Sequence, residues 1–276
     1  MGGAVLEFAG DDPLCLRVVE TLYHAAPPCD DPPTHRYRIE RTASGWIGHA
    51  PAKPLFGAAR LEDVFAFLEW RATEDVLGCP SETEVYVHAA GVGAGSRTFL
   101  LAGPSGSGKS TLAAHLALGG GDGSWGDDVV RFALDSGHFS AFPRSWKLDD
   151  NALKDLDLLA RLTSEGAQGT LLAASVWYVS PAAIRRQWQA PAGKPDVVVV
   201  LEPGHHGDAA RVERMSEGEA ALRVGRALMG TGTGSGPAWS RAMVLVLEAL
   251  KDVAAWRAAG GPPAALARAL VQAVAA

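Results

Sequence analysis

The feature that most constrains this chain is a glycine-rich loop near its middle. Residues 103–110 read GPSGSGKS and complete the pattern G-x-x-x-x-G-K-[ST], the Walker A phosphate loop. The apolar run Phe99–Ala102 before the loop suits a buried strand, and the apolar periodicity of Thr111–Leu118 after it predicts a helix. A turn of Gly and Ser that happens to carry a lysine is the alternative. The complete spacing and the strand–helix context favour the phosphate loop.

Such a loop predicts a nucleotide site. A strand–loop–helix unit directs backbone N–H groups and the positive end of a helix at one point, which suits a phosphate. Glycine at 106 and 108 lets the backbone approach phosphate oxygens. We expect Lys109 to reach the β and γ phosphates and the Ser110 hydroxyl to hold Mg²⁺, with ATP as the nucleotide. The predicted nucleotide-binding residues are Gly103, Pro104, Ser105, Gly106, Ser107, Gly108, Lys109, Ser110 and Thr111.

Phosphoryl transfer also needs an acidic element beyond the loop, to hold Mg²⁺ and to accept a proton. Asp127 and Asp128 lie at the head of a predicted strand, 127–133. Adjacent side chains of a strand point to opposite faces, so the two carboxylates suit different roles. One would contact Mg²⁺ and the other would act as a base toward the acceptor hydroxyl. A solvated Asp pair in a loop is the alternative.

Composition limits the class of protein. With 47% hydrophobic and 20% charged residues among 276, the chain can bury a substantial core. A net charge of -6 argues against nucleic acid or an anionic membrane as the main partner. The three cysteines are far apart without a C-x-x-C pair, which indicates free thiols in a reducing compartment. No secretory signal or membrane-spanning run is evident, so the expected location is cytoplasmic.

The pattern of apolar residues predicts an α/β fold, a mixed sheet flanked by helices. Residues 1–80 are expected to add strands and helices to the same body, as an extension packed on a core of residues 81–276. Expected strands are 4–9, 35–40, 46–49, 84–90, 171–179 and 197–201, and expected helices are 13–24, 61–77, 149–162, 216–229, 239–258 and 262–274. Gly91–Gly95 is expected to be a tight turn, and GGGDGSWG after the phosphate-loop helix is expected to be a loop.

The stretch around the phosphate loop and the Asp pair resembles a known protein family. The string VHAAGVGAGSRTFLLAGPSGSGKSTLAAHLALGG…GDDVVRF resembles the catalytic core of the HPr kinase/phosphorylase family, especially its shorter HPr-kinase-like relatives. Those relatives include kinases of free serine and of serine in ribosomally made peptides such as lasso peptides. Phosphoenolpyruvate carboxykinase shares the core more distantly. The resemblance is strong over residues 85–148 and looser through about 229. It implies a P-loop fold of the HPr kinase/phosphoenolpyruvate carboxykinase type.

The resemblance also implies roles for single residues. It places His88 in the active site, makes Asp127 the catalytic base and directs Asp128 toward the metal. The segment FPRSWKL is similar to an element that often follows in the shorter relatives. Its Arg144 and Lys147 are candidate substrate-binding residues for the γ-phosphate or an acceptor carboxylate. The family's R-G-x-G signature is not found in this sequence, which weakens the case for phosphorylase activity.

The first expectation is therefore an ATP-dependent serine kinase. Its acceptor would be a serine-bearing peptide, protein or small molecule. An oligomer is possible, but the hexameric interface of HPr kinases is not carried over to this chain. The alternative is a nucleotide-dependent switch or ATPase that binds a partner without phosphorylating it. A transport ATPase of the ABC type is disfavoured because no LSGGQ-like signature follows the loop, and a nucleoside monophosphate kinase because no Arg-rich lid is evident.

Three further segments leave their interpretation open. Arg185-Arg186 would bind an acidic partner or, as we favour, lie on a solvated helix face. His205-His206 is interpreted as part of a turn rather than a metal site. The glycine-rich loop 230–237 is either a lid over the acceptor or a plain connection.

Overall fold

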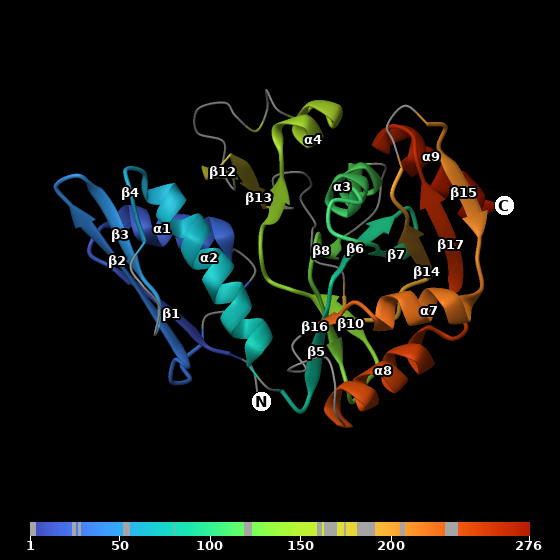
Figure 1. Ribbon diagram of the computed structural model, residues 1–276, viewed down its shortest axis with the longest axis horizontal. Helices are drawn as coiled ribbons and strands as arrows, with labels where there is room; N and C mark the ends of the chain where they lie inside the picture. Colours follow the sequence, from blue (N-terminus) through green and yellow to red (C-terminus); the bar gives the residue numbers. More distant parts are fainter. Residues whose placement is uncertain are drawn as a thin grey trace.

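The computed structural model describes residues 4–23, 26, 29–51, 56–79, 81–118, 123–158, 162, 170–173, 175–180, 191–204, 208–229 and 237–276. Over these residues the chain forms a mixed α/β structure, with four sheets flanked by helices (Figure 1). The largest sheet carries the phosphate loop, and a smaller group of strands and helices lies to one side of it (Figure 1).

The largest sheet has six strands and is covered on both faces. Its order is β15 (Arg211–Arg214), β17 (Ala254–Ala259), β14 (Val197–Leu201), β7 (Arg97–Ala102), β6 (Ala89–Ala94) and β8 (Ser124–Gly126). Strands β17, β14 and β7 are parallel, and the others are antiparallel to their neighbours. The five buried β-branched and leucine side chains of β14 alternate between two cores, as a strand with two covered faces requires.

Helices complete the two cores. Helices α3 (Lys109–Leu118) and α9 (Pro263–Ala275) contribute to the core on one face of the sheet. Helices α7 (Glu217–Gly225) and α8 (Pro237–Leu250) contribute to the core on the other face (Figure 1). The second sheet, in the order β10 (Phe139–Ala141), β9 (Val130–Ala133), β5 (Glu84–Val87) and β16 (Leu228–Met229), extends this second core.

The N-terminal lobe has a hydrophobic core of its own. It consists of β1 (Leu6–Gly10), α1 (Pro13–Leu22), β2 (His35–Thr42), β3 (Gly45–His49), β4 (Phe56–Ala58) and α2 (Leu61–Gly78). Its sheet has the order β1-β2-β3-β4. Tyr37 and Ile39 of β2 pack under Phe65 and Leu68 of α2, and all four side chains are almost fully buried. Helix α2 is thereby fixed on the lobe.

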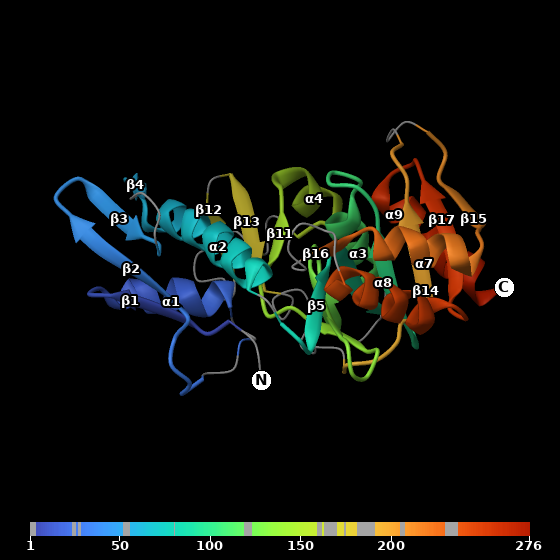
Figure 2. The same ribbon diagram turned by 60° about the horizontal axis from the view of Figure 1, so that its bottom comes forward.

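A three-stranded sheet joins the lobe to the rest of the molecule. It has the order β11 (Trp146–Leu148), β13 (Val176–Val179) and β12 (Thr170–Ala173), and lies between α2 and the short helix α4 (Asp150–Asp155) (Figure 2). Tyr178 of β13 belongs to the core of the N-terminal lobe, while Trp146 and Val179 belong to the core beneath α3. The two cores therefore lie on opposite faces of this sheet.

Several predicted elements differ from the structure. The helix expected over 239–258 ends at Leu250, and Ala254–Ala259 forms strand β17, which ends at two glycines with positive φ. The helix expected over 149–162 is the shorter α4. The strand expected over 171–179 is the hairpin β12–β13, which turns at Ser175 with φ 66°. The helix expected over 216–229 ends at Gly225, and Leu228–Met229 pairs with β5.

The glycine-rich stretch before the phosphate loop is also a strand rather than a turn. Gly91 and Gly93 lie within β6, whose residues are all buried, and the chain turns only at Gly95. Residues 124–126, expected to be part of a loop, form β8 beside β6. Glycine is required at position 91 of this strand, because a Cβ there would stand 2.7 Å from the Cβ of Trp125 in β8.

No helix in the described part of the chain has the length and apolar character needed to cross a membrane.

The close approach of Trp125 to Gly91 leads to a prediction about the stability of a Gly91 variant. We expect Gly91→Ala to lower the free energy of unfolding by about 1–3 kcal/mol, because the added methyl group overpacks a buried site. Gly57→Ala is the control, since a Cβ there would lie 3.7 Å from its nearest neighbour. Urea denaturation of both variants measures the difference, and equal unfolding midpoints would contradict the prediction.

Candidate functional site

The phosphate-loop segment has the strand–loop–helix geometry that its sequence predicts. Strand β7 ends at Ala102, and α3 begins at Lys109. Gly106 and Gly108 adopt φ values of +76° and +86°, which glycine tolerates without strain. Nothing stands within 4 Å of the position that a Cβ would take at either residue. The space beside these two glycines is therefore open, and the first turn of α3, which begins at Lys109, has N–H groups without partners in the helix.

Side chains of the loop interact with the loop itself and with the aspartate pair. Lys109 Nζ donates hydrogen bonds to the carbonyl oxygens of Gly103, at 3.0 Å, and Pro104, at 3.1 Å. Burial lowers the pKa of Lys109, against the opposite pull of Asp128 and Asp127. The Ser110 hydroxyl donates to the carbonyl oxygen of Asp127 at 3.3 Å.

The aspartate pair lies in a bend between β8 and β9, and not within a strand as expected. The bend separates the two side chains by environment. Asp127 is almost completely buried, and its Oδ2 accepts a hydrogen bond from the backbone N–H of Lys147 at 3.0 Å. The side chain of Asp128 is 42% exposed, and its Oδ1 lies 2.8 Å from Nε2 of His88.

These environments shift the pKa values of the two carboxyl groups in opposite directions. Burial raises the pKa of Asp127, and Arg144 only partly offsets that effect. The hydrogen bond from His88 lowers the pKa of Asp128 to about 2, although burial acts against it. Asp127 is thus the stronger proton acceptor of the pair, and Asp128 is the carboxylate that stays charged.

Arg144 lies at the centre of a charged cluster, which we define as Glu69, Asp127, Asp128, Arg144 and Lys147. Its Nη1 donates to Glu69 Oε1 at 3.1 Å, and its Nη2 lies 3.7 Å from one oxygen of each aspartate. Burial alone would lower the pKa of Arg144, but the carboxylates outweigh it and raise the pKa. We expected Arg144 to bind substrate, yet only 4% of its side chain is exposed and it holds three carboxylates instead.

Glu69 is a member of this cluster that sequence reasoning missed. It lies in α2 of the N-terminal lobe, with a side chain that is 0% exposed. Arg144 and Lys147 lower its pKa, although burial acts in the opposite direction. A signal was present in the sequence, because Glu69 comes one helical turn after Phe65 and places a carboxylate on the apolar face of α2.

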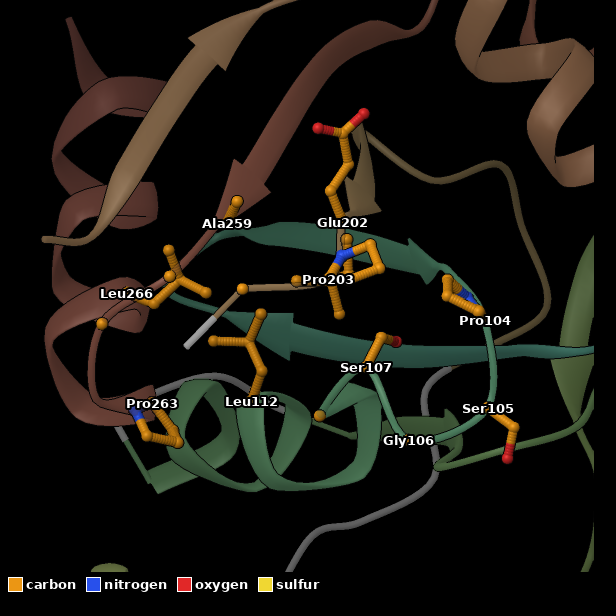
Figure 3. Close-up of a pocket in the computed structure, with 15 residues that line it drawn as sticks. Pro104, Ser105, Gly106, Ser107, Leu112, Glu202, Pro203, Ala259, Pro263 and Leu266 are labelled. Carbon is orange, nitrogen blue, oxygen red and sulfur yellow. The ribbon is translucent and has the colours of Figure 1, made fainter. Parts of the chain in front are cut away.

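Two cavities lie against the phosphate loop. The larger has a volume of about 440 Å³ and is lined by the charged residues Lys109, Asp127, Asp128, Lys147, Asp149 and Asp155, among others. The smaller has a volume of about 220 Å³ and is mainly apolar. In Figure 3, Leu112 of α3, Leu266 of α9 and Pro203 surround it, while the carboxylate of Glu202 points away. Arg144 lines neither cavity.

The structure brings most of the predicted site residues together at the larger cavity, although Gly103, Pro104, Ser107 and Arg144 do not line it. Lys109, Ser110, Asp127, Asp128 and Lys147 line it, and His88 contacts it through Asp128. Residues 185–186, 205–206 and 230–236, for which the sequence left open a partner-binding face, a metal site and a lid, lie outside the described residues.

No protein-family model matches this chain, and no curated protein matches its sequence.

The charged cluster makes a prediction for stability. We expect Arg144→Met to lower the free energy of unfolding by about 3–5 kcal/mol, because Glu69 and Asp127 would keep buried charges without their main partner. Arg36→Met is the control, since the pair that Arg36 forms with Glu7 is exposed and contributes about 1 kcal/mol or less. If chemical denaturation shows equal losses for both variants, the cluster does not stabilise the fold as argued.

The contact between His88 and Asp128 makes a prediction for pH dependence. The pKa of Asp128 is lower in the folded protein than its ordinary value, so its contribution to stability is present above about pH 4 and is lost toward pH 2. We expect His88→Ala to raise this pKa toward the ordinary value and to shrink that contribution. Carboxyl-carbon NMR titration follows the change, with His35→Ala as the control. A midpoint still near 2 would show that His88 is not the cause.

Proposed function

We propose that this protein is an ATP-dependent kinase that transfers the γ-phosphate to a serine hydroxyl of a peptide, a protein or a small molecule. The observation that carries the proposal is the convergence of Lys109, Ser110 and the buried Asp127 on one cavity. The family resemblance supports it, since the HPr-kinase-like proteins combine a phosphate loop with a following Asp pair. A P-loop kinase fold of that type is part of the proposal.

The residues present fit a nucleotide and Mg²⁺. The open cradle over Gly106 and Gly108 suits phosphate oxygens. Ser107 Oγ is buried and has no hydrogen-bond partner among the described residues, so it is free to donate to a phosphate. Ser110 and Asp128 offer oxygen ligands of the kind that Mg²⁺ takes. No group of three or more His, Cys, Asp or Glu with metal-ligand geometry occurs in the described part of the chain, but Mg²⁺ in kinases relies on few carboxylates and on substrate phosphates.

The two cavities suggest how substrates divide around the loop. The apolar cavity beside Leu112 and Leu266 suits the flat face of a nucleotide base (Figure 3). The charged cavity shares Ser105, Gly106 and Gly108 of the loop with the apolar one, and it suits the serine-bearing acceptor. Bound ATP with Mg²⁺ would supply the transferable phosphoryl group between them.

In this proposal each charged residue has a separate task. Asp127 accepts the proton of the serine hydroxyl, and burial keeps its basicity above that of an ordinary aspartate. Lys109 replaces its hydrogen bonds to the carbonyl oxygens of Gly103 and Pro104 with hydrogen bonds to phosphate oxygens, and its charge neutralises part of the negative charge of the phosphates. His88 fixes the orientation of Asp128. Arg144, which lines neither cavity, holds both aspartates in place. Lys147 faces the acceptor cavity.

Transfer of γ-labelled phosphate from ATP to free serine and to serine-containing peptides tests the proposal. We expect Asp127→Asn to lower kcat by about 10²–10⁴-fold, because general-base catalysis contributes that much, while nucleotide affinity stays nearly unchanged. Lys109→Ala should weaken nucleotide binding by about tenfold or more, because it removes a charge from the phosphates. Asp135→Asn, in the turn after β9, is the matched control and should keep full activity.

Other outcomes would point elsewhere. Tight ATP binding with release of inorganic phosphate alone, or with no turnover, would contradict the kinase and favour the nucleotide-dependent switch. Equal activity of Asp127→Asn and Asp135→Asn would contradict the role of Asp127 as the base.

A further inference from the structure

We propose that Glu69 is a positioning residue that holds Lys147 at the acceptor cavity, so that the N-terminal lobe supplies a working part of the site. The inference rests on the proposed kinase function and extends it to a residue outside the phosphate-loop half of the molecule. The proposal is based on one contact: the completely buried carboxylate of Glu69 binds Lys147, the one lysine of the FPRSWKL segment.

Glu69 is held on all sides by hydrogen-bond donors. Its Oε2 lies 2.7 Å from Lys147 Nζ and accepts from the Tyr178 hydroxyl at 3.4 Å. Its Oε1 accepts from Arg144 at 3.1 Å and from the Thr73 hydroxyl at 3.0 Å. A carboxylate with this many donors has one orientation, and it transmits that orientation to the residues it binds.

Lys147 is fixed at both ends by the cluster. Its backbone N–H donates to Asp127 Oδ2 at 3.0 Å, and its ammonium group binds Glu69. The ammonium group also lies 5.6 Å from the centre of the Tyr178 ring. The side chain is 30% exposed and lines the larger cavity, so it combines a fixed position with access to substrate.

The tie to Glu69 matters because a free lysine is a flexible point charge with many rotamers. With Glu69 in place, Lys147 meets the transferring phosphoryl group or the acceptor from a set direction. Without Glu69, Arg144 would lose a hydrogen bond at 3.1 Å but would keep an ion pair with each aspartate at 3.7 Å. The ammonium group of Lys147 would lose the carboxylate that lies 2.7 Å from it. We therefore expect the loss of Glu69 to displace mainly Lys147.

The position of Glu69 depends in turn on the N-terminal lobe. Glu69 directly follows Leu68 and lies one turn after Phe65, and both of these side chains are 0% exposed in the lobe core. The lobe thus determines where the carboxylate stands relative to the phosphate loop. This gives residues 4–78 a task in phosphoryl transfer besides packing.

The test compares Glu69→Gln with wild type in the transfer assay and in a separate measurement of nucleotide binding. We expect kcat to fall by about 10–100-fold, since misplacement of a group by about 1 Å can cost that much, while the Kd for ATP changes by less than about threefold. Glu62→Gln is the matched control, because Glu62 lies on the same helix and pairs only loosely with Arg60, at 3.6 Å. It should leave both quantities unchanged.

A second pair of variants covers the case in which Glu69→Gln does not fold. The double variant Glu69→Gln with Lys147→Met keeps the net charge of the cluster at its wild-type value. If Glu69 acts through Lys147, this double variant and Lys147→Met alone should have kcat values within about threefold of each other, because the two effects are not independent.

The outcomes separate this inference from the proposed function. Full activity of Glu69→Gln, a parallel loss of nucleotide affinity, or a double variant about tenfold or more below Lys147→Met would each overturn the positioning role while the kinase stands. Absence of transfer by the wild-type protein would overturn the proposed function, and this inference with it.

Discussion

The ion pairs of Arg144 are the interaction on which the site depends. A guanidinium with 4% of its side chain exposed is costly to bury unless carboxylates surround it, and here three do. They come from segments far apart in the sequence, one from α2 and two from the bend before β9. The same contact therefore satisfies a buried charge, fixes the aspartates beside the phosphate loop and joins two hydrophobic cores.

The three-stranded sheet explains why these cores meet where they do. Tyr178 and Val179 are neighbours in β13, and their side chains point to opposite faces, so one enters the N-terminal lobe and the other the core beneath α3. Strand β11 of the same sheet carries Lys147. The sheet that joins the lobes is thus also the element that carries the lysine toward the cavity.

Much of the phosphate-loop half could be predicted from sequence because its signals are local. The loop pattern, the β-branched run 197–201 and the Asp pair each require only a few consecutive residues. The errors fall where tertiary contacts overrule local preference. Gly91 pairs with Leu100 of β7 and Gly126 of β8, and Ala254–Ala259 pairs with β14 and β15. Most of these partners are distant in the sequence, so a local pattern does not reveal the pairing. The place of Glu69 on the apolar face of α2 was a local signal that was missed. Its pairing with Arg144 and Lys147 could not be predicted, because no local pattern relates such distant positions.

The bend at Asp127 and Asp128 shows how one dipeptide yields two chemically different carboxyl groups. Had the pair lain in a strand, alternation alone would have separated the side chains. In the bend it is burial that differs, because the side chain of Asp127 is 3% exposed whereas that of Asp128, which contacts His88, is 42% exposed. Burial without enough compensating charge makes the first carboxylate more basic, while a close hydrogen-bond donor makes the second one less basic. The proposed kinase would need one carboxylate that accepts a proton and one that stays charged, and two adjacent residues offer this asymmetry.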